Sequence, residues 1–350
     1  MAISVDGWSG NIPNQAYVTV TVCPPGSANN CQAVDHVLLD TGSFGLRLMA
    51  SVLSPALASA LPPQTDTASG NSLSECTQFV SGYIWGPIKL ADVVMGGEAA
   101  VTMPLQVVDD RPSPIPPAPP SCSSSGVAMN SVAQFGANGV LGVGAFRYDL
   151  GLYYACNGAM CTPVAVPLAK QVQNPVALLK ADNNGVLIDL PALPTGGAAS
   201  ASGSLILGIG TQSNNGLGTA QVYTFDAFGD FTTTYKSGAL TSFVDSGSNG
   251  YFFDDATITP CSNSIGFYCP ASPLALSAII SGFNGASATI NFTLMNIDAT
   301  NDQAMSMIGG PYDGSFSSFD WGLPFFYGRK VFTHIEGMVS PGGAAPYVAF

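Results

Sequence analysis

The chain has 350 residues and carries 9 Lys and Arg against 22 Asp and Glu, which gives a net charge of −13 at pH 7. So few cations argue against nucleic acid and anionic lipid as electrostatic partners, because both are bound through a basic surface. His36 and His334 are too few for a His-rich metal site and have no Ser or Cys partner set for a triad, so we expect no metal and no organic cofactor.

Taken in chain order, the apolar pattern predicts strands joined by tight turns, in keeping with 40 Gly and 26 Pro. Residues 16–23 alternate strictly, with Val18, Val20 and Val22 on one face. Helical spacing is found at 174–182, and a second short helix is predicted near 273–281. The fold class is therefore all-β with few short helices. Further strands are predicted at 34–39, 76–85, 91–95, 101–108, 203–209, 220–225, 229–235, 241–244 and 288–295.

Eight cysteines in an acidic, lysine-poor chain favour an oxidising compartment, so we expect a secreted or periplasmic protein. Residues 1–6 lack the basic and apolar regions of a signal peptide, as expected of a mature chain, and no apolar run is long enough to predict a membrane span. Three cysteine pairs flank short loops and leave a fourth pair, one scheme among the many that eight cysteines allow. These pairs are Cys23–Cys31, Cys156–Cys161, Cys261–Cys269 and, by remainder, Cys76–Cys122.

Two segments interrupt the strand pattern. The Pro-rich stretch 111–120 predicts an extended surface loop close to Cys122, with a Pro-rich recognition ligand as the alternative. The Ala-, Gly- and Ser-rich stretch 195–203 predicts a linker. This linker would divide the chain into an N-terminal lobe, 1–194, and a C-terminal lobe, 195–350.

The two halves share a motif: an apolar strand end is followed by Asp, a hydroxyl residue, Gly and a second hydroxyl residue. A strand end holds a carboxylate rigidly, Gly allows a sharp turn, and hydroxyl groups can fix the carboxylate by hydrogen bonds. If the fold brings the two Asp into contact, the pair would hold one proton at acidic pH and act as acid and base together. The two copies are Asp40-Thr41-Gly42-Ser43 and Asp245-Ser246-Gly247-Ser248.

With these paired motifs the chain resembles the pepsin-like, two-lobed aspartic proteases. Further landmarks follow in the family's order: the apolar-apolar-Gly strand 139–143, the strand 203–208 that opens the second half, and 322–326 near the end. The chain is most similar to a group of exported bacterial proteins that share Gly-Leu-Pro-Phe-Phe-Tyr-Gly-Arg, here 322–329, a group without an established substrate. The resemblance implies two lobes related by a pseudo-two-fold axis, with a cleft between them.

The resemblance also implies roles for the motif residues. Asp40 and Asp245 would form a catalytic dyad that holds the attacking water. The supporting residues would be two hydroxyl residues that bond across the loops, two that support the outer carboxylate oxygens, and two glycines that allow the turns. In that order they are Thr41 and Ser246, Ser43 and Ser248, and Gly42 and Gly247.

The chain departs from the family around the flap, a β-hairpin that carries a Tyr over the cleft. Counting back from 95–97 places Phe79 at the Tyr position and Gly82 near the hairpin tip. Tyr83 or Trp85 would replace the lost ring, or would be ordinary strand aromatics facing a core. The family's Trp after the first motif falls on Arg47, whose charge would lower the pKa of a nearby carboxylate if the side chain turned inward. The second apolar-apolar-Gly motif, 320–322, is imperfect.

We therefore expect a monomeric aspartic endopeptidase that cleaves peptide or protein substrates with a water activated by Asp40 and Asp245, without a covalent intermediate. One alternative keeps the fold but not the reaction: a cleft that binds peptide or glycan without cleaving it, favoured by the altered flap and Arg47. A glycosidase would need its two carboxyl groups about 5 Å or more apart, further than a pair that shares a proton. In a third alternative, the two Asp would be unrelated turn caps.

Overall fold

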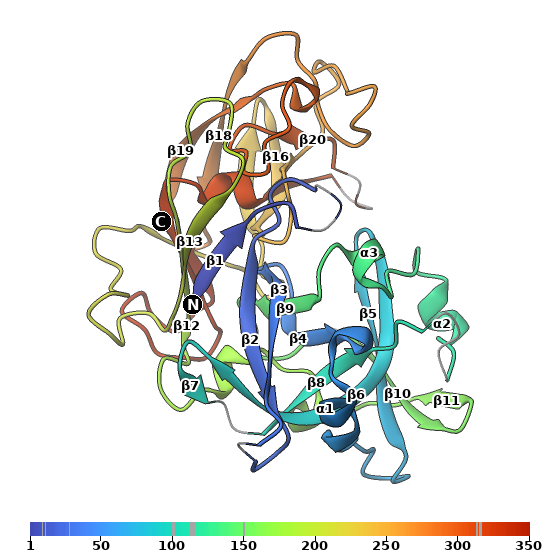
Figure 1. Ribbon diagram of the computed structural model, residues 1–350. Coiled ribbons are helices and arrows are strands. Elements are labelled where there is room, and N and C mark those ends of the chain that lie inside the picture. Colours follow the sequence, from blue (N-terminus) through green and yellow to red (C-terminus); the bar gives the residue numbers. More distant parts are fainter. Residues whose placement is uncertain are drawn as a thin grey trace.

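The computed structural model describes residues 1–8, 10, 12–27, 29–99, 102–111, 116–149, 151–312, 314 and 317–350. Within these ranges the chain forms two β-sheets and a few short helices, so the prediction of an all-β fold is confirmed (Figure 1). The strands of the larger sheet are β1 (Ala2–Val5), β2 (Tyr17–Cys23), β3 (Gln32–Asp40), β4 (Phe44–Met49), β5 (Ser72–Phe79), β6 (Gly82–Met95), β7 (Glu98–Ala99), β8 (Met103–Val108), β9 (Gly139–Val143), β10 (Leu152–Asn157), β11 (Met160–Pro163), β12 (Gly185–Leu190), β13 (Ala201–Leu207), β14 (Val222–Thr224), β22 (Arg329–His334) and β23 (Tyr347–Ala349).

The larger sheet follows the order β11-β10-β5-β6-β8-β4-β9-β3-β2-β1-β13-β12-β22-β23-β14, and β7 pairs with β6. The smaller sheet, at the top of Figure 1, follows the order β19-β18-β15-β16-β21-β17-β20. Its strands are β15 (Phe231–Tyr235), β16 (Gly238–Val244), β17 (Tyr251–Phe252), β18 (Leu274–Ser281), β19 (Ser287–Leu294), β20 (Gly309–Gly310) and β21 (Ser318–Trp321).

The helices are short. α1 begins at Pro55, a residue suited to the first helical position, and the Ser54 hydroxyl accepts a hydrogen bond from the Leu57 N–H at 3.3 Å. No helix in the described ranges is long and apolar enough to cross a membrane. The α-helices are α1 (Pro55–Ala60), α2 (Pro120–Ser123) and α3 (Val132–Phe135), and the 3₁₀ helices are η1 (Ala50–Val52), η2 (Leu168–Lys170), η3 (Val176–Leu178), η4 (Ile297–Ala299) and η5 (Leu323–Phe326).

The helix predicted at 174–182 is wrong, because only the single turn η3 forms there. The Asn174 side chain accepts a hydrogen bond from the Val176 N–H at 3.1 Å and donates one to the Gly144 carbonyl at 2.8 Å. These bonds tie the start of the turn to its neighbours. Leu179 then has an extended backbone, so the chain leaves the helix after one turn.

The helix predicted near 273–281 is also wrong, because these residues form β18. Ala278 and Ile280 are 2% and 0% exposed, whereas Ile279 between them is 42% exposed. This period of two is that of a half-buried strand, and adjacent β-branched residues favour it over a helix. Pairing with β15 and β19 on its two sides fixes the strand.

The two predicted loop segments are only partly loops. In the stretch 195–203, β13 begins at Ala201 and pairs with β1 and β12. Within the Pro-rich stretch, residues 112–115 lie outside the described residues. Beyond them the chain is tied to β6 by the Trp85 indole N–H, which donates to the Pro116 carbonyl at 2.9 Å, and then enters α2.

Strands from both predicted lobes meet in the larger sheet. β1 pairs with β13, and β12 pairs with both β13 and β22. One continuous sheet therefore contains strands from both predicted lobes, although the Asp245 motif itself follows β16 of the smaller sheet. The division into 1–194 and 195–350 stays a prediction.

The same three-strand arrangement occurs twice. In the first copy β9 lies between β3, to which it is parallel, and β4, to which it is antiparallel. In the second copy β21 lies in the same way between β16 and β17. The loop that joins the outer two strands carries Asp40 in the first copy and Asp245 in the second. The repeat read in the sequence is thus also a repeat of topology.

Four disulfide bonds staple the described chain, between the same cysteine pairs as those expected from loop length. Three of them close short loops, whereas the fourth joins β5 to α2 across 46 residues. Disulfide bonds persist in oxidising compartments, so the framework is compatible with a protein located outside the cytoplasm. The pairs are Cys23–Cys31, Cys76–Cys122, Cys156–Cys161 and Cys261–Cys269.

Candidate active site

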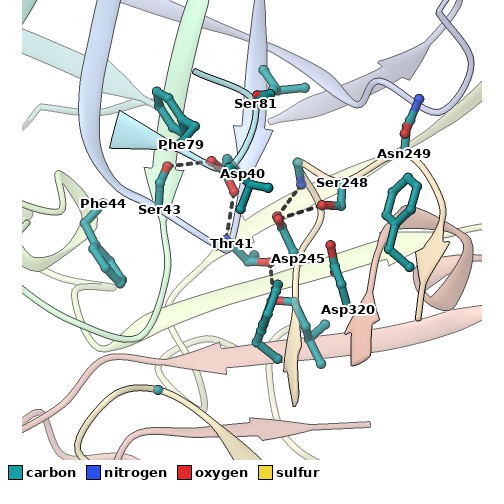
Figure 2. A pocket seen from close by; sticks show the side chains of 18 of the residues that line it. Asp40, Thr41, Ser43, Phe44, Phe79, Ser81, Asp245, Ser248, Asn249 and Asp320 are labelled. Carbon is teal, nitrogen blue, oxygen red and sulfur yellow. Dashed lines mark hydrogen bonds between the residues drawn. The ribbon is translucent and has the colours of Figure 1, made fainter. Parts of the chain in front are cut away.

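Both motif carboxylates sit at strand ends and are held by matching hydrogen bonds (Figure 2). On Asp40, Oδ1 accepts from the Gly42 N–H at 2.7 Å and Oδ2 accepts from the Ser43 hydroxyl at 2.5 Å. On Asp245, Oδ1 accepts from the Gly247 N–H at 2.7 Å and Oδ2 accepts from the Ser248 hydroxyl at 2.9 Å. The second motif therefore repeats the first atom by atom. Each carboxyl group is fixed by its own loop.

The two loops also interlock through Thr41 and Ser246. The Thr41 hydroxyl donates to the Val244 carbonyl at 3.0 Å and accepts from the Ser246 N–H at 2.9 Å. In return, the Ser246 hydroxyl donates to the Leu39 carbonyl at 2.7 Å and accepts from the Thr41 N–H at 3.1 Å. Each hydroxyl thus satisfies a buried donor and a buried acceptor of the other loop. This reciprocity fixes the spacing of the two carboxyl groups.

Replacing Thr41 by Val should lower the free energy of unfolding by about 2 kcal/mol, because a buried N–H and a buried carbonyl each lose their partner. Thr41→Ser keeps the hydroxyl and serves as the matched control, with a loss of less than about 1 kcal/mol expected. Urea unfolding of the three proteins measures the difference. Equal stability of Thr41→Val and wild type would show that these bonds do not hold the loops together.

The two carboxyl groups lie side by side, since a Cβ on Gly247 would lie 2.8 Å from Oδ1 of Asp40 and 3.1 Å from Oδ1 of Asp245. Burial, and next the charge of Asp245, raise the pKa of Asp40 well above its ordinary value, although the hydrogen bonds from Ser43 and Gly42 act in the opposite direction. Two carboxyl groups this close bind one proton more readily than an isolated carboxyl group does, so the pair titrates as a unit.

The glycines bring the loops this close. A Cβ on Gly42 would lie 2.7 Å from Cγ of Asp245, and a Cβ on Gly247 would lie 2.8 Å from Cγ of Asp40. Contacts of this length are too short for a side chain. Each glycine therefore makes room for the carboxyl group of the opposite loop.

The dyad lies in a cleft of about 1140 Å³ that is lined by both halves of the chain. Its volume exceeds the usual range for small-molecule pockets, as expected of a site that takes an extended ligand. Its aromatic and aliphatic lining comes from Phe44, Phe79, Val80, Met129, Phe135, Phe146, Phe225, Phe228, Phe243, Phe252, Ile265, Phe267 and Tyr312.

Comparison with known proteins assigns the chain to a family. Residues 1–350 match the family model described as "Protein of unknown function (DUF3443)". The chain belongs to this family. No curated protein matches the sequence. The family description gives no activity, so the chemistry of this DUF3443 chain has to be inferred from the site.

The β5–β6 hairpin lies over one side of the cleft of the DUF3443 chain. Phe79, Val80 and Ser81 at its tip line the cleft, and the Phe79 ring contacts the Phe135 ring edge to face at 5.9 Å. None of these three tip residues carries the phenol hydroxyl that the resemblance to pepsin-like proteases leads us to expect on a flap. Phe79 is thus the one aromatic residue that the hairpin tip itself brings to the cleft.

Three of the predicted flap residues do not line this cleft, so their assignment to substrate binding is corrected. Tyr83 and Trp85 are 8% and 1% exposed and pack with Tyr154 around the Cys76–Cys122 disulfide. They follow the alternation of β6 to the face away from the cleft. At Gly82 the Val127 carbonyl approaches so closely that a Cβ would lie 2.2 Å from it. The alternative reading, strand aromatics facing a core, is the correct one for Tyr83 and Trp85.

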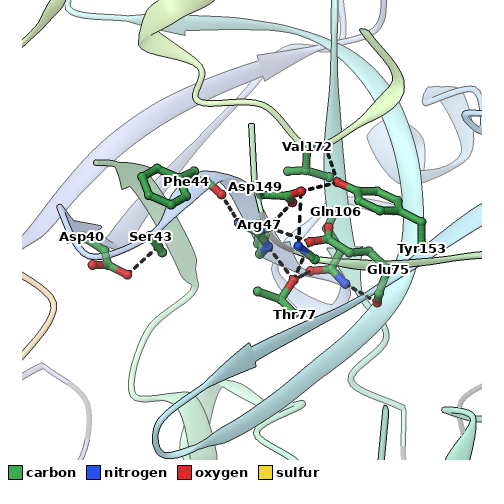
Figure 3. Close-up of polar contacts among 11 residues, drawn as sticks. Asp40, Ser43, Phe44, Arg47, Glu75, Thr77, Gln106, Asp149, Tyr153 and Val172 are labelled. Atoms are coloured by element: carbon green, nitrogen blue, oxygen red, sulfur yellow. Dashed lines mark hydrogen bonds and ion pairs between the residues drawn. The ribbon is translucent and has the colours of Figure 1, made fainter. Parts of the chain in front are cut away.

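Arg47 turns inward, but toward Glu75 and Asp149 and not toward Asp40 (Figure 3). Its Nη2 lies 2.7 Å from Glu75 Oε1 and 2.7 Å from Asp149 Oδ2, its Nε donates to the Thr77 hydroxyl at 2.7 Å, and Nη1 donates to the Phe44 carbonyl. The guanidinium thereby joins the loop after Asp40 to β5 of the hairpin. Arg47, Glu75 and Asp149 are 1%, 0% and 3% exposed.

This network holds one cation for two buried carboxyl groups. Burial, and next the charge of Glu75, raise the pKa of Asp149 to about 8, despite the opposing charge of Arg47. Arg47 does lower the pKa of this nearby carboxyl group, as expected of an inward-turned cation, but burial and the charge of Glu75 outweigh it. Tyr153 donates to Asp149 at 2.7 Å and completes its hydrogen bonding.

Three buried acids in or beside the site were not identified as site residues from the sequence: Glu75, Asp149 and Asp320. The signal for Asp320 was present, because this acid occupies the first apolar position of the second apolar-apolar-Gly motif. Glu75 and Asp149 have no comparable local signal, since their partner Arg47 lies 28 and 102 residues away.

One group of side chains in the described ranges has the spacing of a metal site, namely Cys261, Cys269 and Asp298. The two cysteines form a disulfide bond. Their sulfur atoms are therefore not available as thiolate ligands.

Proposed function

We propose that this protein is an aspartic endopeptidase of the pepsin-like type, in which Asp40 and Asp245 activate a water molecule. The observation that carries the proposal is the contact between two carboxyl groups held by matching loops in a cleft lined by both halves. Such a pair shares one proton at acidic pH and offers an acid and a base at the same point. The twofold topology around the dyad agrees with the resemblance to pepsin-like proteases.

In the proposed reaction, the Asp245 carboxylate takes a proton from water while Asp40 gives its proton to the oxygen of the scissile carbonyl. The water oxygen bonds to the carbonyl carbon, which gives a neutral gem-diol. When this intermediate breaks down, Asp245 passes its proton to the leaving nitrogen and one diol hydroxyl returns a proton to Asp40. The C–N bond breaks, and the dyad recovers its starting state without a covalent enzyme intermediate.

An extended peptide fits the shape of the site. It would lie along the cleft and could pair its backbone groups with the β5–β6 hairpin, while alternate side chains enter the aromatic lining. We further propose that the protein works in an oxidising compartment, secreted or periplasmic, where its four disulfide bonds persist. The low sequence pI of 4.1 agrees with an acidic working pH.

The test is cleavage of an unfolded protein between about pH 3 and pH 6, with and without a statine-type peptide that mimics the tetrahedral intermediate. We expect cleavage at acidic pH that the mimic blocks. The product ends should show hydrolysis within the chain, as an endopeptidase produces. Absence of cleavage by the folded protein at every pH, together with no binding of the mimic, would overturn the proposal.

The second candidate is a cleft protein that binds peptide or glycan without hydrolysing it. The observation in its favour is the hairpin tip, where Phe79 offers no hydroxyl group to a bound substrate. Binding of unmodified peptides or oligosaccharides without turnover, measured by calorimetry across the same pH range, would favour this function over the protease.

A further inference from the structure

Asp320 is a third carboxyl group beside the dyad, and the strand pairing aims it at the cleft. In β21 it lies opposite Phe243 of β16 and Phe252 of β17. Residues opposite one another in a sheet share a face, and successive residues alternate. Phe319 and Trp321 on either side of it therefore face the core, while Phe243 and Phe252 line the cleft. Figure 2 shows Asp320 in this cleft, close to Asp245.

This carboxyl group is buried without a counter-charge. Asp320 is 3% exposed, and its Oδ1 has no hydrogen-bond partner in the part of the chain that the structure describes. Burial, and next the charges of Asp245 and Asp40, raise its pKa well above the ordinary value, and the nearby Ser248 hydroxyl acts in the opposite direction. A buried carboxyl oxygen normally has a partner, so the unpaired Oδ1 in a cleft points to a ligand.

The surroundings of Asp320 favour a cation as that ligand. Among the described residues that line the cleft, the basic side chain is Arg47, which Glu75 and Asp149 already hold. Aromatic rings stand beside Asp320 instead: Phe243 and Phe252 flank it in the sheet, and Tyr312 contacts the Phe243 ring edge to face at 6.4 Å. Ring faces attract cations, and more strongly where water is excluded.

We propose that Asp320, Phe243, Phe252 and Tyr312 form a subsite for the ammonium group of a substrate lysine. This inference rests on the proposed endopeptidase function. A lysine side chain is long, thin and unbranched, so it can reach a carboxyl group at the back of an aromatic-lined cleft. Its ammonium group brings three donors for Asp320 and a positive charge for the rings.

Ammonium binding and proton binding compete at Asp320. The titratable groups that act on it are Asp245 after β16 and Asp40 at the end of β3, and its own charge acts on Tyr312 after β20, while β17 brings the uncharged Phe252. An incoming ammonium group supplies the missing opposite charge and displaces the proton. Selectivity for lysine should therefore rise with pH across the active range.

The test uses pairs of peptides that differ in one residue, lysine or norleucine, which has a similar shape without the amine. The pair is made at each position from the third before to the third after the cleaved bond, and kcat/KM is measured at each pH. We expect one position at which lysine is preferred about tenfold or more, as a charged hydrogen bond implies. Asp320→Asn should bring that preference close to one.

Asp230→Asn is the charge control, because Asp230 lines the cleft just before β15 and its charge acts on Tyr312, but it is not among the groups that act on Asp320. It should keep the lysine preference within about threefold of wild type. Equal loss in both variants would assign the preference to the general charge of the cleft and overturn the subsite.

The same lysine and norleucine pairs, built into statine-type peptides that cannot be cleaved, separate the two proposals. Cleavage without any lysine preference would overturn the subsite and leave the protease intact. Selective binding of the lysine-containing peptide by wild type but not by Asp320→Asn, with no cleavage of any peptide, would keep the subsite and overturn the protease.

Discussion

Replacing Asp245 by Asn is expected to lower kcat/KM for peptide hydrolysis by about 10³-fold, and Asp40→Asn by a similar factor. An amide can neither take the proton from water nor return one to the leaving nitrogen, and it cannot share the proton of its partner. The double variant should be no worse than either single variant, because the two groups act as one unit. The loss of kcat/KM is measured from initial rates of cleavage of one peptide, under conditions in which the progress curves show no initial burst.

Asp189→Asn is the matched control for this series, since Asp189 lies on β12 outside the cleft, 40% exposed and 3.8 Å from Lys330. It should retain wild-type rates within about twofold. Folding of every variant is checked by its circular dichroism and its urea midpoint. Hydrolysis by folded Asp245→Asn at a rate close to that of wild type would remove Asp245 from the mechanism.

The coupling of Asp40 and Asp245 can also be tested by spectroscopy. The charge of Asp245 helps to raise the pKa of Asp40, so Asp245→Asn should move the pKa of Asp40 down, while burial still holds it above its ordinary value. Isotope-edited infrared titration of the Asp side chains reports this shift directly. An unchanged titration would show that the two carboxyl groups are not coupled.

The sequence predicts those parts of the fold and site that repeat or that depend on local pattern. The strand class follows from alternation, as in 16–23, and the paired motifs mark Asp40 and Asp245 because each copy carries its own supporting hydroxyls and glycine. The two predicted helices that do not form, at 174–182 and 273–281, show the limit of prediction from local pattern. At 273–281 the apolar residues fit the periodicity of a helix as well as that of a strand, and only pairing with the neighbouring strands β15 and β19 determines that a strand forms.

Partners distant in the chain could not be predicted. Arg47 contacts Glu75 and Asp149 only because the fold packs three separate segments of the chain together, and no local spacing in the sequence encodes that packing. Asp320 is an intermediate case for prediction from the sequence, because a comparison of the two motif copies would have identified it as unusual. Its counterpart in the first copy, by register, is the apolar Val140, opposite Leu38 in β3. The twofold pattern thus predicts an apolar residue where the structure buries an acid beside the dyad.

Replacing Arg47 by Met is expected to lower the free energy of unfolding by about 3 to 5 kcal/mol at neutral pH, the usual loss when one partner of a buried ion pair is removed. Met has a similar length and packs in the same space, so the loss reports the charge and its hydrogen bonds and not a cavity. Both Glu75 and Asp149 would then lack a cation in a site that is nearly closed to water.

The pH dependence of the free energy of unfolding tests this explanation, and its direction follows from the pKa of Asp149. In the wild type, the pKa of Asp149 is raised to about 8, so its proton stabilises the fold below its ordinary pKa, and this stability is lost as pH rises toward 8. In Arg47→Met no cation is left beside the two buried carboxyl groups, so folding without an unpaired buried charge requires one more bound proton than in the wild type. Each pH unit above the ordinary carboxyl pKa should then widen the stability gap by about 1.4 kcal/mol. Urea unfolding of both proteins from about pH 4 to pH 7 measures this gap.

Arg47→Met combined with Glu75→Gln and Asp149→Asn is the matched control. With all three charges gone, no buried charge is left unpaired, so most of the lost stability should return. The hairpin gives a second measurement, since Arg47 ties Phe44 after the dyad loop to Thr77 in β5. Hydrogen exchange of β5 should speed up in Arg47→Met and slow again in the triple variant. A pH-independent loss that the triple variant does not restore would mean that Arg47 acts by packing alone.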